Sequence, residues 1–170
     1  MKAITFTKPG GPAVLQLTAV ADPVPTPDQL LVRVRASALN RADTMQRLGA
    51  YPPPPGESDI LGLELAGEVE AVGSAVQGFA PGDRVFGLVG SGGYAEKAVI
   101  DARMAMRIPD GWSFTQAAAV PEVYFTAQET IFTLGGLKAG ETILIHAGAS
   151  GVGTAGIQMA RETGARILIT

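Results

Sequence analysis

The chain has 170 residues, and its content of 46% hydrophobic and 17% charged residues is typical of a folded globular protein, not of a disordered one. Its formal net charge of −3 argues against a basic surface for nucleic acid, and no run of about 18 apolar residues predicts a membrane span. The absence of cysteine excludes disulfides, and a single histidine, His146, leaves too few thiolate and imidazole ligands for a usual zinc site.

The first two-thirds of the chain predicts a β domain. The N-terminal residues alternate like a strand and lack the long apolar core of a signal peptide, so we expect a cytoplasmic protein. A short helix is predicted over Asn40–Leu48. Turns containing glycine or proline separate the other segments, as in a compact β-barrel. The predicted strands are Lys2–Phe6, Leu15–Val20, Gln29–Ala36, Leu65–Val72, Arg84–Leu88 and Tyr94–Ile100.

The pattern becomes helical after Trp112, which we expect in the core. Residues Ser113–Leu134 have helical composition, and Pro121 is expected to divide them into two helices. Ser113 and Thr115 are both candidates for the first N-cap. We therefore expect a β domain over residues 1–112, followed over 113–170 by connecting helices and the segment described next.

The last 30 residues predict one strand–helix–strand unit. Glu141–His146 is apolar enough for a buried parallel strand, and Gly151–Thr163 has a helical pattern with Gly164 as its C′ residue. Arg166–Thr170 begins another strand. This order is the start of a doubly wound α/β fold of the Rossmann type, which the chain does not complete.

The turn between the first strand and the helix has the G-x-G-x-x-G spacing at Gly151, Gly153 and Gly156. We expect Gly151 to permit the sharp turn, Gly153 to let a pyrophosphate approach the backbone, and Gly156 to let the helix pack on the sheet. Exposed N–H groups and the helix dipole would then hold the anion. The alternative is a glycine-rich helix start without a ligand. The residue that selects NAD or NADP, about 20 residues further on, falls just past Thr170.

Several motifs together resemble one family, the medium-chain dehydrogenase/reductase superfamily, in its zinc-free quinone reductase and zeta-crystallin branch. The resemblance extends over the whole chain and implies a GroES-like β-barrel domain followed by the start of a Rossmann fold. Family chains are about twice this length, so we expect an N-terminal half. The motifs are Ala38–Asp43, Tyr51–Pro54, Ile60–Glu64, Pro81–Val85 and Ile145–Gly153.

The resemblance also implies chemistry: hydride transfer from NADPH to a quinone or a reactive carbonyl or enone acceptor. In the zinc branch a cysteine stands at Asn40 and a histidine at Leu63, so this chain is expected to work without zinc. Catalysis would then depend on holding the nicotinamide and the acceptor in contact. Homodimers are common in the family, which leaves a homodimer open here.

Candidate site residues follow from the same resemblance. Asn40 would hydrogen-bond the acceptor or the nicotinamide ribose, although it could equally cap the following helix. Tyr51 would border the acceptor, by stacking or by donating a hydrogen bond, or it would pack on the proline run that follows. Thr126 would bind the nicotinamide carboxamide. The turn residues that would contact the cofactor phosphates are Ser150, Gly151, Val152 and Gly153.

Other polar residues are expected to be structural. Asp43 lies one turn after Asn40 and would make a structural hydrogen bond. Glu64 would need a partner if buried, such as Arg41 or a backbone donor. His146 is expected to pack beneath the turn.

Three functions remain open from the sequence. The first is a zinc-independent NADPH-dependent quinone oxidoreductase acting on a small molecule. The second is a non-catalytic N-terminal fragment of such an enzyme, with an exposed strand edge near Thr170. The third is an enoyl thioester reductase of the same superfamily.

Overall fold

The structure, a computed structural model, describes all residues from Met1 to Thr170. The chain forms two compact units, Met1–Ala119 and Val120–Thr170. The division falls later than the sequence pattern indicated, because the short helix α2 (Phe114–Ala118) packs against strands of the first unit. Ser113 is its N-cap, as expected, and its hydroxyl accepts a hydrogen bond from the Gln116 N–H.

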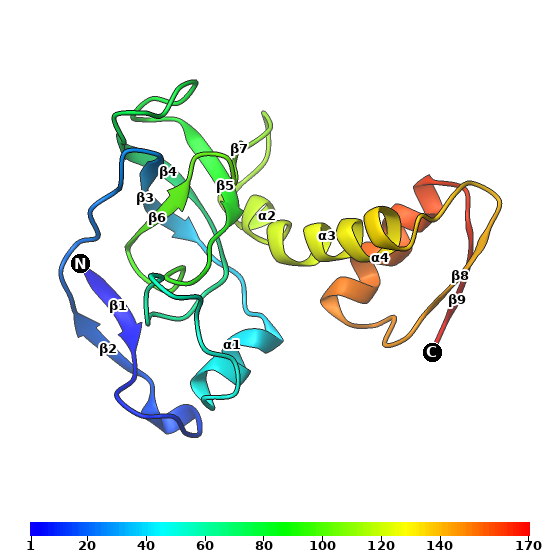
Figure 1. The fold of residues 1–170 in the computed structure, drawn as a ribbon, viewed down its shortest axis with the longest axis horizontal. Helices are drawn as coiled ribbons and strands as arrows, with labels where there is room; N and C mark the ends of the chain where they lie inside the picture. The colour runs from blue at the N-terminus through cyan, green and yellow to red at the C-terminus, as the bar shows by residue number, and fades with distance from the viewer. The chain divides into compact units, whose positions relative to one another are not determined.

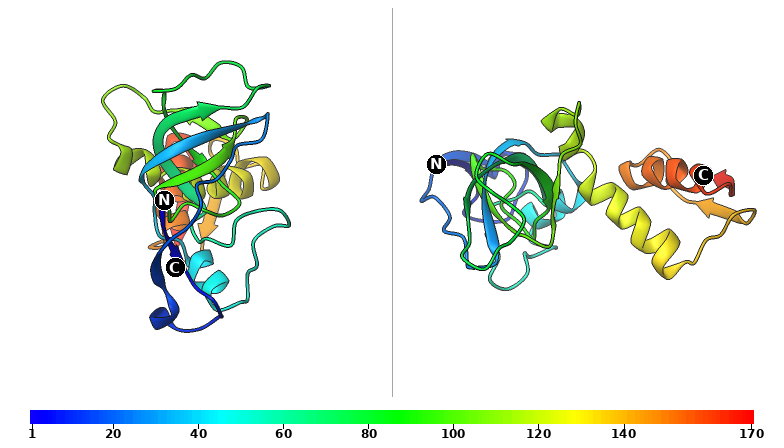
Figure 2. Two further views of the ribbon diagram at one scale, coloured as in Figure 1. Left: turned by 90° about the vertical axis from the view of Figure 1, so that its left-hand side faces the viewer. Right: turned by 90° about the horizontal axis from the view of Figure 1, so that it is seen from above.

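The first unit is a curled half-barrel of antiparallel strands in the order β6-β3-β4-β5-β7, and its strands curve around a common interior (Figure 2). The two remaining strands, β1 and β2, form a separate antiparallel pair. The strands are β1 (Lys2–Thr5), β2 (Gln16–Ala19), β3 (Gln29–Ala36), β4 (Glu64–Val72), β5 (Arg84–Leu88), β6 (Lys97–Asp101) and β7 (Ala105–Arg107), with a 3₁₀ turn η1 (Pro12–Val14) and the helix α1 (Arg41–Arg47).

The strand β3 shows how the core of the half-barrel is filled. From Val32 to Arg35 its side chains alternate between the interior and solvent. Before that, Leu30, Leu31 and Val32 are all buried, because the pairing with β4 shifts register between Leu31 and Val32. The core cluster comprises Leu30, Val32, Leu65, Val69, Val85, Ala98, Ile100 and Ala105.

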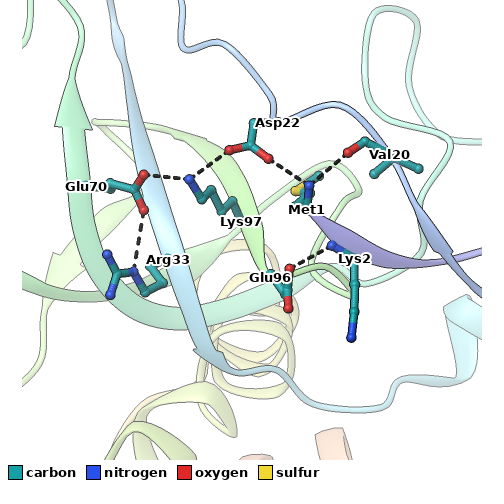
Figure 3. A network of polar contacts seen from close by, with 8 residues as sticks. All are labelled: Met1, Lys2, Val20, Asp22, Arg33, Glu70, Glu96 and Lys97. Atoms are coloured by element: carbon teal, nitrogen blue, oxygen red, sulfur yellow. Dashed lines mark hydrogen bonds and ion pairs between the residues drawn. The ribbon is translucent and has the colours of Figure 1, made fainter.

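An ion-pair network crosses the open face of the first unit (Figure 3). Lys97 on β6 places its Nζ 2.8 Å from Asp22 Oδ2 and 2.6 Å from Glu70 Oε1. Asp22 also accepts a hydrogen bond of 2.9 Å from the ammonium of Met1. The hydrogen bond from Lys97 lowers the pKa of Asp22 to about 2, with a second contribution from the Met1 ammonium, and it also lowers the pKa of Glu70.

This network predicts a pH-dependent stability. The carboxyl pKa values are lower in the folded than in the unfolded protein, so the stabilisation is complete above the unfolded values and is lost as pH falls towards the folded ones. We expect Lys97→Met to lower the melting temperature at pH 7, and this difference to shrink as pH falls from about 5 towards 2. Thermal melts of the intact protein over this pH range measure the difference in melting temperature, and Lys138→Met, at an exposed lysine, is the control. A difference independent of pH would contradict the assignment.

The second unit contains the predicted strand–helix–strand arrangement. The strands β8 (Thr142–Ile145) and β9 (Arg166–Ile169) pair in parallel, and α4 (Gly151–Glu162) connects them (Figure 1). Gly164 follows the helix with φ +80°, as expected of a C′ glycine. Before β8, the helix α3 (Pro121–Ala127) continues directly into a π-helix, η2 (Gln128–Leu134), which the sequence did not predict.

The prediction that the first strand of this unit is buried is wrong for this chain. Leu144 is 53% exposed, and on β9 Leu168 and Ile169 are 45% and 60% exposed. Parallel strands are normally covered on both faces, but here the helix that packs against the two strands is α4. No helix of the chain is long and apolar enough to cross a membrane.

Candidate active site

Asn40 lies just after β3 and is the N-cap of α1, so the alternative role considered for it is real. It forms a capping box with Asp43, in which the Asn40 N–H donates to Asp43 Oδ2 at 2.6 Å. In the other half of the box the Asn40 side chain faces the Asp43 backbone N–H. The side-chain Nδ2 also donates to Oε1 of Glu64 at 2.7 Å, which connects the end of β3 to the start of β4.

Asp43 is the buried acceptor that holds this corner together, which confirms its expected structural role. It is 5% exposed, and its Oδ2 also accepts a 2.6 Å hydrogen bond from the Tyr94 hydroxyl. Burial, and then this hydrogen bond, raise the pKa of Tyr94 well above its ordinary value. Tyr94 therefore keeps its proton and serves as a fixed donor, not as a general acid tuned to neutral pH.

Leu63, where the resemblance implies a histidine in the zinc branch, and Glu64 after it are both buried, at 7% and 1% exposure. The Glu64 carboxylate accepts a hydrogen bond from the Asn40 amide, a contact that the sequence did not predict. The chain contains no cluster of three or more histidine, cysteine, aspartate or glutamate side chains that could hold a metal.

The sequence also did not predict a second series of hydrogen bonds in this unit. Gln46 is 4% exposed, and its Nε2 donates to Ser91 Oγ at 3.2 Å, while the Ser91 hydroxyl donates to the Ile60 carbonyl. Gln46 Oε1 and Asp43 Oδ1 are buried without a donor. No local pattern identifies such pairs, because their members lie 31 and 45 residues apart in the sequence.

Tyr51 lies in the loop that follows α1 and is 50% exposed. Its ring is therefore open to a partner, and both roles predicted for it remain predictions. Asn40 and Tyr51 belong to the first unit, whereas the other candidate residues belong to the second unit.

The glycine-rich turn of the second unit follows β8. Its one left-handed non-glycine residue is Ala147, with φ 54°, so Ala147 and not Gly151 makes the sharp turn. Ser150 is the N-cap of α4, and its Oγ accepts the Gly153 N–H at 3.0 Å. A Cβ at Gly153 would lie 2.4 Å from the Ala147 carbonyl oxygen. Gly153 is thus required by the closure of the turn itself.

The other two glycines make room for side chains of the preceding helix. A Cβ at Gly151 would lie 2.9 Å from Cγ1 of Val123 on α3, and one at Gly156 would lie 2.8 Å from Cδ1 of Ile131 on η2. Ile145 on β8 is further from Gly156, at 3.6 Å. Gly156 therefore allows close packing, as predicted, but mainly against η2 and only secondarily against the sheet.

Two backbone donors remain uncommitted at the start of α4. The Gly153 N–H is taken by Ser150, whereas no acceptor within the protein receives the N–H groups of Gly151 and Val152. Gly151 is exposed and Val152 half-buried. The N-terminal end of a 12-residue helix with free N–H groups and a serine hydroxyl is chemically suited to a phosphate.

Thr126 lies near the end of α3, half-buried, and its carbonyl accepts a 2.7 Å hydrogen bond from Thr130 Oγ1 in the π-helix. Its own hydroxyl has no partner within the protein, so its predicted contact with a carboxamide remains open. His146 is exposed and its Nδ1 lies 2.9 Å from Thr170 Oγ1, so the prediction that it packs beneath the turn is wrong.

Comparison with known proteins finds a family model and relatives that match this chain. Residues 26–110 match the family model of the alcohol dehydrogenase GroES-like domain. The chain is 40% identical over 172 residues to the quinone oxidoreductase of Lama guanicoe, a match that covers 100% of this chain and 52% of that protein. It is 46% identical over 155 residues to erythronolide synthase of Saccharopolyspora erythraea, covering 88% of this chain and 4% of that protein.

Solved structures agree in fold. The Escherichia coli quinone oxidoreductase complexed with NADPH matches with a TM-score of 0.90 at 36% identity, over 99% of this chain and 52% of that chain. The CurK enoyl reductase matches with a TM-score of 0.90 at 29% identity, over 99% and 53% of the two chains. This chain therefore spans about half the length of the quinone oxidoreductases that it matches.

Proposed function

Since the chain belongs to the family of alcohol dehydrogenase GroES-like domains, as the N-terminal half of the quinone oxidoreductase branch of the medium-chain dehydrogenase/reductases, we propose that it is part of an oxidoreductase that transfers hydride from NADPH to a quinone or related enone. NADPH, when bound, supplies the hydride. The similar E. coli structure is described as a complex with NADPH, which supports this choice of cofactor.

The observation that carries the proposal is the start of α4. The free N–H groups of Gly151 and Val152, with the Ser150 hydroxyl beside them, would hold the diphosphate of the dinucleotide. Gly153 would contribute by closing the turn that presents these donors. Thr126 would bind the nicotinamide carboxamide, as the family resemblance implies.

In the first unit, Asn40 and Tyr51 are proposed to line the place of the reaction. Asn40 would hydrogen-bond the cofactor or the acceptor, and the exposed ring of Tyr51 would border the acceptor. Leu63 offers no metal ligand, which supports a reaction that depends on positioning instead of on zinc. A quinone accepts hydride readily, and water or a hydroxyl group would supply the proton.

Turnover with a chelator present tests this function. The intact protein is expected to oxidise NADPH when a benzoquinone is added, and EDTA is expected to leave the rate unchanged, because no step uses a bound metal. Absorbance at the NADPH band follows the reaction, with NADH in parallel to establish the cofactor preference. Loss of activity in EDTA that zinc restores would refute the zinc-free mechanism.

A second candidate function is supported by two of the comparisons. The chain is similar to the CurK enoyl reductase and to erythronolide synthase. An enoyl thioester reductase would reduce a carbon–carbon double bond conjugated to a thioester. Parallel measurement of kcat/KM for a quinone and for a crotonyl thioester separates the two functions, since the higher value identifies the acceptor class.

Three further statements stay predictions: the cytoplasmic location, a homodimer, and the preference for NADPH over NADH. A non-catalytic role of the 170-residue chain taken alone is also still open. Dinucleotide titration of that chain tests it, because tight binding would rule out an inert fragment.

A further inference from the structure

We propose that the proline run Pro52–Pro55 is a docking surface for a protein domain that recognises polyproline II helices through a groove lined with aromatic side chains. Such domains bind segments with two prolines three positions apart, and Pro52 and Pro55 have this spacing. The surface lies within the first unit, and binding to it needs neither cofactor nor acceptor, so the proposal goes beyond the proposed function.

The backbone conformation of this segment is dictated by its prolines. The ring of each proline fixes φ at about −65°, and a residue that precedes a proline is restricted to the extended region. Each residue from Tyr51 to Pro54 precedes a proline, which favours a polyproline II helix over this stretch. The structure agrees, since residues 52–54 belong to no helix or strand and the following turn begins at Pro55.

The exposure of the segment follows the period of this helix. A polyproline II helix repeats every three residues, so residues three positions apart lie on the same edge. Pro53 is half-buried and forms the edge that faces the protein. Tyr51 and Pro54 form a second edge, and both are exposed. Pro52 and Pro55 form the third edge and are exposed as well, so two adjacent edges are open to a partner.

The segment is held in place at both ends. Before it, α1 ends at Gly49, whose φ of +80° lets the Ala50 N–H donate to the Met45 carbonyl at 2.9 Å. After it, the Glu57 N–H donates to the Pro54 carbonyl at 3.1 Å. A segment that already has the conformation of the bound state loses little conformational entropy on binding, which favours recognition by a partner.

The chemistry of the segment indicates what the groove of the partner carries. Proline has no N–H, so the run offers only rings and carbonyl oxygens. The carbonyls of Tyr51, Pro52 and Pro53 accept no hydrogen bond within the protein, so they are available to the indole and hydroxyl donors of tryptophan and tyrosine. Exposed carboxylates at Glu57 and Asp59 follow the run, which suits a groove with lysine or arginine at its rim.

Titration of isolated polyproline-binding domains with the intact protein tests this proposal. The probes are one SH3, one WW and one EVH1 domain, each labelled with ¹⁵N, because their amide signals show which surface binds and with what Kd. We expect at least one of them to bind through its aromatic groove. The Kd should be on the order of 100 μM, because a single helical turn buries little surface.

Three single substitutions in the run distinguish the exposed edges from the half-buried one. Pro52→Ala and Pro54→Ala each remove an exposed ring, whereas Pro53→Ala removes the ring that faces the protein. In all three variants the new alanine still precedes a proline, so the backbone stays restricted to the extended region. Pro52→Ala and Pro54→Ala should each weaken binding at least about fivefold, and Pro53→Ala less than about twofold. Thermal melting shows whether each variant is folded.

Three results would overturn the proposal: no domain binds the folded intact protein, a domain binds through a surface other than its aromatic groove, or Pro53→Ala weakens binding as much as Pro54→Ala. If Pro53→Ala does not fold, Pro109→Ala replaces it as control, because Pro109 is exposed and lies outside the run. NADPH and quinone are absent from these titrations, so a failure here leaves the proposed function unaffected.

Discussion

Asp43→Ala is expected to lower the free energy of unfolding of the intact protein by about 3 kcal/mol, because it removes half of a capping box and the shorter hydrogen bond of the half-buried Tyr94 hydroxyl, which keeps only its 3.1 Å contact with the Ala38 carbonyl. Asp43 accepts both the Asn40 N–H and the Tyr94 hydroxyl, and it is 5% exposed, so water does not readily replace it. Urea unfolding followed by fluorescence measures the change. Because Asn40 loses its anchor, NADPH binding should weaken as well.

Two matched variants show whether the hydrogen bonds or the charge of Asp43 matter. Asp43→Asn keeps one oxygen that can accept both donors, so it should lose clearly less stability than alanine. Tyr94→Phe removes one donor only and should cost about 1 kcal/mol. If Asp43→Ala is as stable as wild type, the hydrogen bonds that Asp43 accepts from Asn40 and Tyr94 do not stabilise this unit.

Gly151→Pro is expected to weaken NADPH binding by at least about tenfold, because it deletes one of the two free N–H groups at the start of α4. Proline is well tolerated at the first position of a helix, and Ser150 before it has the extended conformation that proline requires, with φ −73° and ψ 165°. The helix should therefore form normally, and only the donor is lost.

Gly151→Ala is the matched control for this variant. Both substitutions add a Cβ, which in either case lies close to Cγ1 of Val123, at 2.9 Å. Only proline removes the N–H. Melting temperatures of the two variants should agree, while their Kd values for NADPH should differ. Equal affinities would mean that this N–H does not contact the diphosphate.

Much of the fold was predictable because it is encoded locally. The bounds of β3 and β5 were predicted residue for residue, and Gly164 and Ser113 terminate or begin helices by their own conformational preferences. The strand β7 was missed because three residues carry no usable pattern. The π-helix was missed because its residues have ordinary helical composition, and its register depends on packing against α4.

The burial of particular residues was less predictable. Trp112, expected in the core, is 40% exposed at the junction before α2. The strand β8 looks apolar enough for a buried position, but its side chains alternate between half-buried and exposed, because its neighbours among these 170 residues are β9 and α4. The hydropathy of a side chain indicates that it can be buried, whereas its actual exposure depends on which residues lie next to it in space.

For the candidate site, the sequence singled out residues by motif but did not predict the contacts that they make. Asn40 was selected because it lies in the motif Ala38–Asp43, and the glycine-rich turn because it lies in the motif Ile145–Gly153. The bond from Asn40 to Glu64 and the one from Tyr94 to Asp43 join residues 24 and 51 positions apart, and no periodic pattern encodes such pairs. The roles of the glycines were also partly misassigned, since free space around a backbone becomes visible only once the packing is known.

Equilibrium titration of the intact, metal-depleted protein with NADPH tests the central claim, that the N-terminus of α4 binds the diphosphate of a nicotinamide dinucleotide without help from a metal. We expect saturable binding of one NADPH per chain, unchanged by EDTA and weaker in Gly151→Pro than in Gly151→Ala. If the folded wild-type protein binds neither NADPH nor NADH under these conditions, the account is wrong.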